Sequence, residues 1–251
     1  MSTPTHDTKA HYAATESLLG QLLPNGLTYD IDGHIITGHA DTSAGRVRLL
    51  GTVHGAAMNH QIAIRLADEI LALIADGDKT PVVFVVDTQG QDLSRADELL
   101  CLNHSFAHLA SCVELLRVSG YANLAIIFGQ AVSGGFLSYG LMANEVYAFD
   151  DSQVKVMDLN AMARVTKIPV ERLQSLSQTS AIFAPGVENY YKMGAIKDIW
   201  TTPVTSDVIG DALARQQADI SAVSMDKRRT LAQERQGRQL CADIVQAVLS
   251  A

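Results

Sequence analysis

The sequence predicts an α/β fold in which parallel strands alternate with helices. Two short apolar runs, residues 82–86 and 124–128, are rich in β-branched, aliphatic and aromatic residues, as are strands buried on both faces. One amphipathic helix is predicted before the first run, and another between the two runs. This alternation of strand and helix is typical of βαβ units around a parallel sheet.

The composition is that of one globular domain with short additions. Of 251 residues, 47% are hydrophobic and 18% are charged, which is enough apolar material for one sizeable core. The net charge of −8 argues against nucleic-acid binding, and no apolar stretch approaches the ~18–20 residues that cross a bilayer. The polar N-terminus is unlike a signal or transit peptide, and three sparse cysteines fit a reducing compartment. We therefore expect a cytoplasmic location and no membrane contact.

The pattern of apolar residues predicts the first elements. Residues 1–42 show weak periodicity and are expected to form an N-terminal extension, ahead of a core over 43–205 and a helical C-terminal arm, part of the same domain, over 206–251. Residues 46–53 predict a strand. Residues 59–74 predict a helix, because four apolar side chains share one face: Ile62, Leu66, Ile70 and Leu73.

A long helix is expected between the two buried strands. It begins near Ser94, whose Ser-Arg-Ala-Asp spacing resembles a capping box, and ends at Gly120. Apolar residues at steps of three and four give it a core-facing stripe: Leu99, Leu102, Phe106, Leu109, Val113 and Leu116. Further along, a helix is expected from Gly134, with strands at 145–149 and 154–158 and a helical remainder.

The stretch Ala-Val-Ser-Gly-Gly at 131–135 has two chemical interpretations. In the first, Ser133 is a nucleophile on a relaxed strand–turn–helix elbow, A-x-S-x-G, of the α/β-hydrolase kind. Those enzymes need an acid and then a histidine after the serine, whereas all eight histidines of this chain, the last being His108, precede Ser133. The hydrolase order is therefore excluded, and another order of triad residues stays open.

In the second interpretation, the backbone of the glycine pair provides the chemistry. The N–H groups of Gly134 and Gly135 lie in the first turn of a helix, where they lack intrahelical acceptors, and a ligand oxygen can approach them because side chains are missing. Aided by the helix dipole, such donors bind a developing oxyanion, each contributing ~3–4 kcal/mol to the transition state. The alternative is that the glycines only permit close packing of the helix on the strand.

A second glycine-containing turn, Asp-Thr-Gln-Gly-Gln-Asp-Leu-Ser at 87–94, also joins a buried strand to a helix. Such turns lie at the carboxyl ends of the strands, where α/β folds bind ligands. Asp87 alone is typical of a loop or a helix cap. Because Gly90 and the pair at 134–135 are expected at the same edge of the sheet, a cleft between the two turns is predicted.

Two other clusters favour structural roles. One is Cys101, His104, His108 and Cys112. These residues extend over three turns of one helix and cannot converge on one metal ion, which leaves at most a two-ligand site completed from elsewhere. A polar helix face or a subunit contact is the better account. The other is Lys227, Arg228, Arg229, Arg235 and Arg238. This basic cluster is most simply a solvated helix face, with docking of an acidic partner as the alternative.

Several blocks of the sequence resemble a known family. "PVVFVVDTQG", a long helix, and then "LAIIFGQAVSGGFLSYGLMANEVYAF" resemble the carboxyltransferase branch of the crotonase superfamily, where acyl-CoA carboxylases have D-T-P-G and G-x-x-x-S-G-G-A. "AMARVTK", "FAPGVENYYKMGAI" and "RQGRQL" are similar to the gamma subunit of biotin-independent malonate decarboxylase. The resemblance covers roughly residues 45–240.

The resemblance implies a crotonase-like (ClpP/crotonase) fold of layered β-sheets with surrounding helices. It also implies that the chain pairs with a homologous beta subunit to decarboxylate malonyl-S-acyl carrier protein to acetyl-S-acyl carrier protein and CO2, through a thioester enolate. An alpha (transferase) subunit and a delta (acyl carrier protein) subunit complete the implied complex. No cofactor or metal is expected on this chain, because the substrate is carried on the phosphopantetheine arm of the carrier protein.

The resemblance also implies site residues. The oxyanion-hole glycines carry over to Gly134 and Gly135, and the second hole of the carboxyltransferases carries over to Gly90 and the amide of Gln91. Flanking residues are expected to contact the substrate: Ser133, Gln130 and Phe136. Gln89 stands where the biotin enzymes have proline, which agrees with a biotin-independent member.

Of three other functions, one is not expected and two stay open. Enoyl-CoA hydratases need glutamates beside the glycine turn, where this chain has Phe136 and Leu137, so hydration chemistry is not expected. A noncatalytic scaffold for a beta subunit that holds all the chemistry stays open. A serine hydrolase that uses Ser133 is the remaining alternative.

Overall fold

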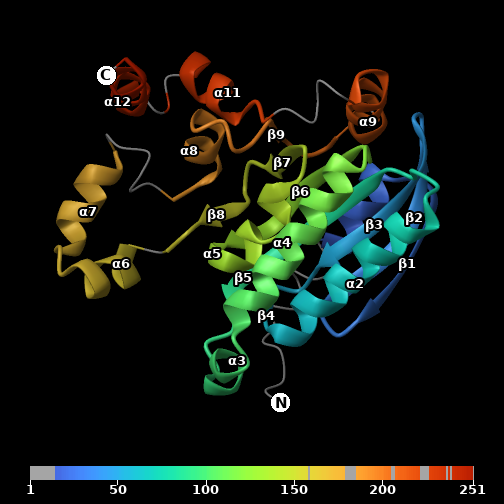
Figure 1. Cartoon of the computed structure of the whole chain (residues 1–251), viewed down its shortest axis with the longest axis horizontal. Helices are drawn as coiled ribbons and strands as arrows, with labels where there is room; N and C mark the ends of the chain where they lie inside the picture. Colours follow the sequence, from blue (N-terminus) through green and yellow to red (C-terminus); the bar gives the residue numbers. More distant parts are fainter. Residues whose placement is uncertain are drawn as a thin grey trace.

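A computed structural model of the chain describes residues 15–157, 159–178, 185–204, 207–220, 226–235, 237 and 239–250 (Figure 1). Its centre is a nine-stranded sheet of order β1-β2-β3-β5-β6-β7-β9, in which β4 pairs with β5 and β8 pairs with β6. The strands are β1 (Asn25–Asp32), β2 (Ile35–Thr42), β3 (Gly45–Thr52), β4 (Ala56–Met58), β5 (Val82–Gln91), β6 (Asn123–Val132), β7 (Glu145–Phe149), β8 (Gln153–Lys155) and β9 (Asp198–Trp200).

Helices surround this sheet. They are α2 (His60–Asp76), α3 (Arg95–Leu99), α4 (Leu102–Val118), α5 (Ser133–Leu137), the 3-10 turn η1 (Gly140–Met142), α6 (Leu159–Thr166), α7 (Val170–Ser177), α8 (Val187–Lys192), α9 (Val208–Ala218), α11 (Arg228–Glu234) and α12 (Gln239–Leu249). A further helical segment covers 15–22. None of the helices in the described ranges is both long enough and apolar enough to cross a bilayer.

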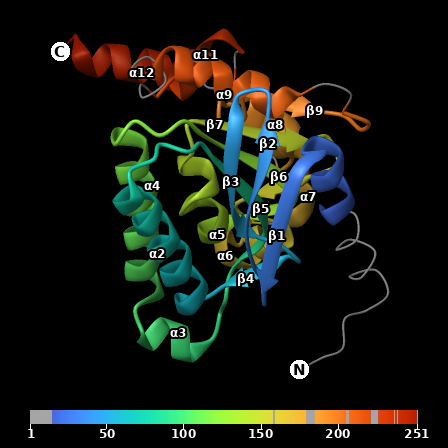
Figure 2. The ribbon, with the colours of Figure 1, turned by 90° about the vertical axis from the view of Figure 1, so that its right-hand side faces the viewer.

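The buried strands separate two apolar clusters. Along β5, Val82, Phe84 and Val86 pack on one side with α2 and α4, whereas Val83 and Val85 pack on the other with α9 and the helical segment at 15–22. Figure 2 shows α2 and α4 together on one side of the sheet. The runs 82–86 and 124–128 are covered on both faces and apolar at every position, so the prediction of buried parallel strands is confirmed.

The N-terminal part differs from the expected extension. β1, β2 and β3 form antiparallel pairs, and β3 then runs parallel to β5, so residues 25–42 are two strands of the sheet itself. β1 alternates only between exposed and half-buried positions. Leu27, Tyr29 and Ile31 are its half-buried positions and pack against one of the two apolar clusters. They alternate with polar residues, so the sequence does carry the period of a strand, which the prediction of an extension overlooked.

The long helix expected after Ser94 is broken in two. Ser94 accepts a hydrogen bond from the N–H of Asp97 at 3.1 Å, which confirms the cap, but α3 ends at Leu99. Cys101 has φ 58° and turns the chain before α4 begins. The predicted stripe is buried at Leu109 and at other α4 positions, whereas Leu99 is 73% exposed, so its core assignment was wrong.

Beyond residue 158, the regular elements of the described residues are helices apart from the strand β9, which the sequence did not predict. The strand expected at 154–158 is β8 and ends at Lys155, and Asp158 lies outside the described residues. Helices α6 and α7 project from the body of the molecule, and α11 and α12 lie at the end opposite to α3 (Figures 1 and 2).

Candidate functional site

The ends of β5 and β6 build the candidate site. The two strands run parallel, and their register shifts between Val86 and Thr88. Before the shift they are flanked by β3 and β7, and after it by the short strands β4 and β8. The end of β5 thus pairs with β4, and the end of β6 pairs with β8. Because β5 and β6 are parallel, their ends bring the two glycine turns to the same edge of the sheet.

The two turns are in contact. Ser133 has φ 50° and Gly90 has φ 104°, both in the left-handed region that L side chains rarely adopt. A Cβ added to Gly90 would lie 3.4 Å from Cβ of Ser133. The structure therefore places Gly90 beside the turn that carries Gly134 and Gly135, whereas the cleft between the turns stays a prediction.

Gly135 is packed too closely for any side chain. A Cβ there would lie 2.6 Å from Oγ1 of Thr88, 3.0 Å from the carbonyl oxygen of Gly90 and 3.0 Å from Cγ of Met58. A Cβ on Gly134 would meet the ring of Phe106 at 3.0 Å. Close packing of helix on strand is thus a sufficient reason for glycine at position 135.

The same turn also presents backbone donors. α5 begins at Ser133, so Gly134 and Gly135 lie in its first turn, where N–H groups have no intrahelical acceptor. The capping residue Val132 supplies no side-chain hydrogen bond. The packing role and the donor role are compatible, because packing uses the Cα atoms and an oxyanion would use the N–H groups.

The second turn is more extended than expected. Residues 87–91, expected to start a loop, continue β5 and pair with β4. The N–H of Gly90 donates to Oγ1 of Thr88 at 3.1 Å, and that hydroxyl donates to the carbonyl of Ala56 at 2.7 Å. In this structure, therefore, the Gly90 N–H already has a partner within the chain.

The side chain of Gln91 lies between the two turns. Its Oε1 is buried without a hydrogen-bond donor from any described residue. The same atom would lie 3.3 Å from a Cβ on Gly134. The proposed donor at this position is the backbone amide of Gln91, but the structure also places its carboxamide beside the first turn.

Of the other residues expected to contact substrate, two are half-buried at the turn and one is buried in the core. Ser133 and Gln130 are half-buried at the turn, and the N–H of Gln130 donates to Oδ1 of Asp87 at 3.0 Å. Phe136 is 1% exposed and packs edge-on against Tyr190, with ring centroids 6.4 Å apart. Its ring thus belongs to the apolar core.

Asp87 has a larger role than sequence reasoning gave it. It is fully buried, and its two carboxylate oxygens accept from the N–H of Gly55 at 2.9 Å and from that of Gln130. A buried carboxylate needs such donors. Asp87 therefore ties the loop after β3 to the end of β6, next to the glycine turn.

No described histidine forms a hydrogen bond with Ser133. Nε2 of His54 lies 3.7 Å from Oε1 of Glu16, and Nδ1 of His34 lies 3.2 Å from the carbonyl oxygen of Val53. Nδ1 of His60 lies 2.5 Å from Oγ of Ser105. Ser133 has the backbone conformation of an elbow residue, but the described residues give it no base.

The pair formed by His60 and Ser105 is a feature that the sequence analysis missed. Ser105 lies on α4 and is 3% exposed, so its hydroxyl fixes α4 to the start of α2 and is closed to solvent. The backbone N–H of His60 donates to Asp97 at 2.8 Å. That bond, together with Ser94, holds the pKa of Asp97 below its usual range. No sequence spacing indicates these contacts, because they join three separate helices.

The cysteine–histidine cluster does not form a metal site within the described ranges. Sγ of Cys112 lies 3.8 Å from Nε2 of His108, and burial raises the pKa of that thiol. Cys101 is exposed at the break before α4. Cys101 therefore does not share the helix face of His104, His108 and Cys112, and the polar face or subunit contact expected there stays a prediction.

The basic cluster is not simply a solvated face. Nη1 of Arg235 donates to the carbonyls of Tyr191 at 2.8 Å and Ile196 at 2.7 Å, and Nη2 donates to that of Lys197 at 2.9 Å. Nη1 of Arg228 donates to the carbonyl of Leu141 at 2.8 Å. These two arginines fasten α11 to η1, α8 and the loop before β9, which corrects the expectation for them. Lys227 and Arg229 are exposed, and Arg238 lies outside the described residues.

Comparison with known proteins decides the family. The family model described as malonate decarboxylase gamma subunit matches residues 54–251. The chain belongs to the malonate decarboxylase gamma subunit family. A curated relative, malonyl-S-ACP:biotin-protein carboxyltransferase MADD of Malonomonas rubra, is 30% identical over 125 residues, or 49% of this chain and 43% of that protein. The chain therefore spans less than half the length of this relative.

Solved structures similar to this family member share its fold. A Pseudomonas malonate decarboxylase hetero-tetramer in complex with coenzyme A has a TM-score of 0.77 at 23% identity, covering 93% of this chain and 99% of that chain. The Pseudomonas MdcD-MdcE hetero-dimer has a TM-score of 0.72 at 21% identity, covering 96% and 98%. Transcarboxylase 12S has a TM-score of 0.65 at 15% identity, covering 80% and 40%. The predicted carboxyltransferase-type, crotonase-like fold is confirmed.

Proposed function

We propose that this chain is the gamma subunit of a biotin-independent malonate decarboxylase. With a homologous beta subunit, it decarboxylates malonyl-S-acyl carrier protein to acetyl-S-acyl carrier protein and CO2. The alpha subunit supplies acyl transfer, and the delta subunit carries the thioester on its phosphopantetheine arm. The family membership and the similarity to a malonate decarboxylase hetero-dimer support this proposal.

The reaction needs stabilisation of one negative charge. The bond between the α-carbon and the carboxylate breaks, CO2 leaves, and the electron pair passes to the thioester as an enolate. A proton then adds to the α-carbon and gives the acetyl thioester. Preorganised N–H donors that point at the enolate oxygen stabilise this charge without a metal or an organic electron sink.

The observation that carries the proposal is the uncapped first turn of α5. The N–H groups of Gly134 and Gly135 lie at the carboxyl edge of the sheet, at a turn in contact with Gly90. In the proposed mechanism these two groups bind the enolate oxygen. Gly90 and the amide of Gln91 line the second half of the site, where the Gly90 N–H must leave Thr88 before it can bind substrate.

The packing of Gly135 favours a second candidate function. Because Thr88, Gly90 and Met58 already exclude any side chain there, the glycine does not by itself require an oxyanion. The second candidate is therefore a noncatalytic subunit that supports the beta subunit, with all the chemistry in the partner.

Reconstitution tests whether the activity needs both subunits and whether Ser133 is a nucleophile. Malonyl-S-acyl carrier protein turnover is measured for this chain, for the beta subunit and for their complex, and we expect activity only in the complex. Ser133→Ala keeps the backbone path and should leave turnover within about tenfold, or ~1.4 kcal/mol, of the wild type. A Ser133→Ala complex that assembles normally but has no activity would support a nucleophilic serine and contradict the proposal.

A further inference from the structure

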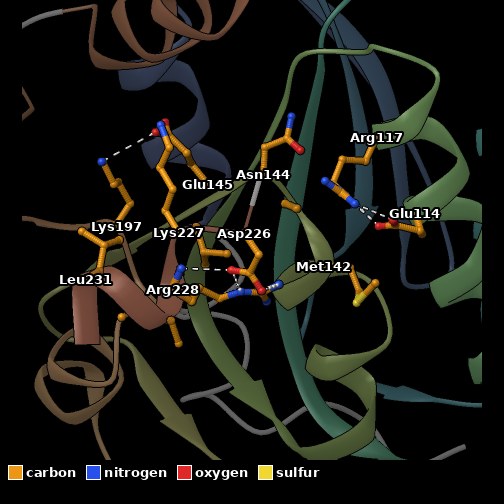
Figure 3. A pocket seen from close by; sticks show the side chains of 14 residues that line it. Glu114, Arg117, Met142, Asn144, Glu145, Lys197, Asp226, Lys227, Arg228 and Leu231 are labelled. Atoms are coloured by element: carbon orange, nitrogen blue, oxygen red, sulfur yellow. Dashed lines mark hydrogen bonds and ion pairs between the residues drawn. The ribbon is translucent and has the colours of Figure 1, made fainter. Parts of the chain in front are cut away.

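A cavity lies at the opposite end of the sheet from the glycine turns. It has a volume of about 240 Å³ and opens between the end of α4, the start of β7, the loop before β9 and the start of α11 (Figure 3). Glu145, on its wall, pairs with Leu124 at the beginning of β6, whereas the glycine turn follows the end of that strand at Val132. The cavity is therefore separate from the proposed catalytic site.

Two arginine–carboxylate pairs line this cavity, one on α4 and one at the start of α11 (Figure 3). Nε of Arg117 donates to Glu114 at 2.7 Å, and Nε and Nη2 of Arg228 donate to Asp226 at 2.8 and 2.9 Å. The arginines hold the pKa of Glu114 and the pKa of Asp226 below their usual range, so both carboxylates are ionised at neutral pH. These walls are charged and fixed.

The charges around the cavity do not cancel. Each lining carboxylate has its own cation, because Glu145 lies 3.9 Å from Nζ of Lys197 and the other two pair with arginine. Lys227 also lines the cavity, is exposed, and has no ion pair with any described residue. A cavity with one surplus cation on a chain of net charge −8 favours an anion.

The size and the floor of the cavity restrict the ligand. Met142, Val146 and Leu231 give it an apolar surface beside the charged walls. An engineered protein cavity of ~150 Å³ holds benzene, so this one can hold a somewhat larger molecule. A ligand that fits has one or two anionic oxygens and a short apolar body.

We propose that this cavity binds a small organic anion, a carboxylate or a phosphate ester, with Lys227 as its charge partner. The bound anion lies between α11, α4 and η1, to which Arg228 already ties α11 through the carbonyl of Leu141. Binding therefore stabilises the attachment of α11 to the sheet edge. The inference concerns a site remote from the glycine turns and is independent of the proposed decarboxylation.

Calorimetric titration of the full-length chain, alone and in complex with the beta subunit, tests this site. Malonate and inorganic phosphate serve as separate probes, which distinguish a carboxylate ligand from a phosphate ligand. We expect saturable binding of at least one probe to both forms. The matched variants are Lys227→Glu and Arg229→Glu, which change the net charge equally on neighbouring exposed residues, of which only Lys227 lines the cavity.

We expect Lys227→Glu to weaken binding by about tenfold or more, and Arg229→Glu to change it by less than about threefold. The neutral pair Lys227→Gln and Arg229→Gln repeats the comparison if a charge reversal disturbs folding. No saturable binding of either probe, or equal effects of the two variants, would overturn the proposal. Binding to the isolated chain that disappears in the complex would show a subunit contact instead, and would overturn it too.

Discussion

Adding a single methyl group at position 135 should destabilise the chain. In Gly135→Ala the new Cβ would lie 2.6 Å from Oγ1 of Thr88. That hydroxyl cannot move freely, because it donates to the carbonyl of Ala56 and accepts from the N–H of Gly90. Overpacking costs about 1–3 kcal/mol, and each buried hydrogen bond that is lost adds about 0.5–1.5 kcal/mol. With both hydrogen bonds lost, we therefore expect a loss of about 2–6 kcal/mol in the free energy of unfolding.

Thermal and urea unfolding measure this loss. For a chain of this size, it corresponds to a fall of about 5–15 °C in Tm. The double variant Gly135→Ala/Thr88→Ala removes the hydroxyl that clashes, so it should be less destabilised than the sum of the single variants by about 1–2 kcal/mol. A Gly135→Ala chain with unchanged Tm, or strictly additive effects, would refute the close packing described for this turn.

Two further predictions concern parts of the chain away from the glycine turns. Arg235→Lys should lower the free energy of unfolding by about 1–3 kcal/mol, because a lysine cannot reproduce three hydrogen bonds from one planar group. The control Arg229→Lys, at an exposed position, should change the free energy of unfolding by less than about 0.5 kcal/mol. Equal Tm values for the two variants would contradict this prediction. Desolvation by burial lowers the pKa of His54, so the unfolded chain binds its proton more readily and stability should be lost as pH falls below about 6.5. His54→Asn suits the positive φ of 66° and should reduce this loss in urea unfolding at pH 5.5 and 7.5, and an unchanged pH dependence would count against it.

The buried strands and the helix α2 could be predicted, because their apolar residues follow a regular pattern in the sequence. β5 and β6 are apolar at successive positions, and α2 buries the four side chains that share one face of its sequence. Two features were missed. The alternation of β1 is confined to three half-buried residues, Leu27, Tyr29 and Ile31, and the break at Cys101 depends on a left-handed residue that no helix signal marks.

The candidate site could be located from the sequence but not described. Gly90 lies at the end of β5, and Gly134 and Gly135 directly follow β6, so their placement at one edge follows from parallel topology. Their neighbours come from elsewhere in the chain: Met58 on β4 and Phe106 on α4. Single-sequence reasoning cannot find such contacts, because they join α5 to elements that lie far away along the chain.

The central claim is that backbone N–H groups of this chain stabilise the enolate. Replacing Gly134 with glycolic acid turns its N–H into an ester oxygen and adds no side chain. Gly134→Ala is the matched control, since it keeps the N–H and adds a Cβ whose nearest neighbours are the ring of Phe106 at 3.0 Å and Oε1 of Gln91 at 3.3 Å.

The decisive measurement is kcat of the reconstituted beta–gamma complex with malonyl-S-acyl carrier protein, with Tm and assembly as controls. The ester variant should lose about 10²-fold or more in kcat, comparable to the loss of one oxyanion donor, while Gly134→Ala stays within about tenfold of the wild type. An assembled ester variant with wild-type kcat would contradict the claim and place the oxyanion hole in the beta subunit.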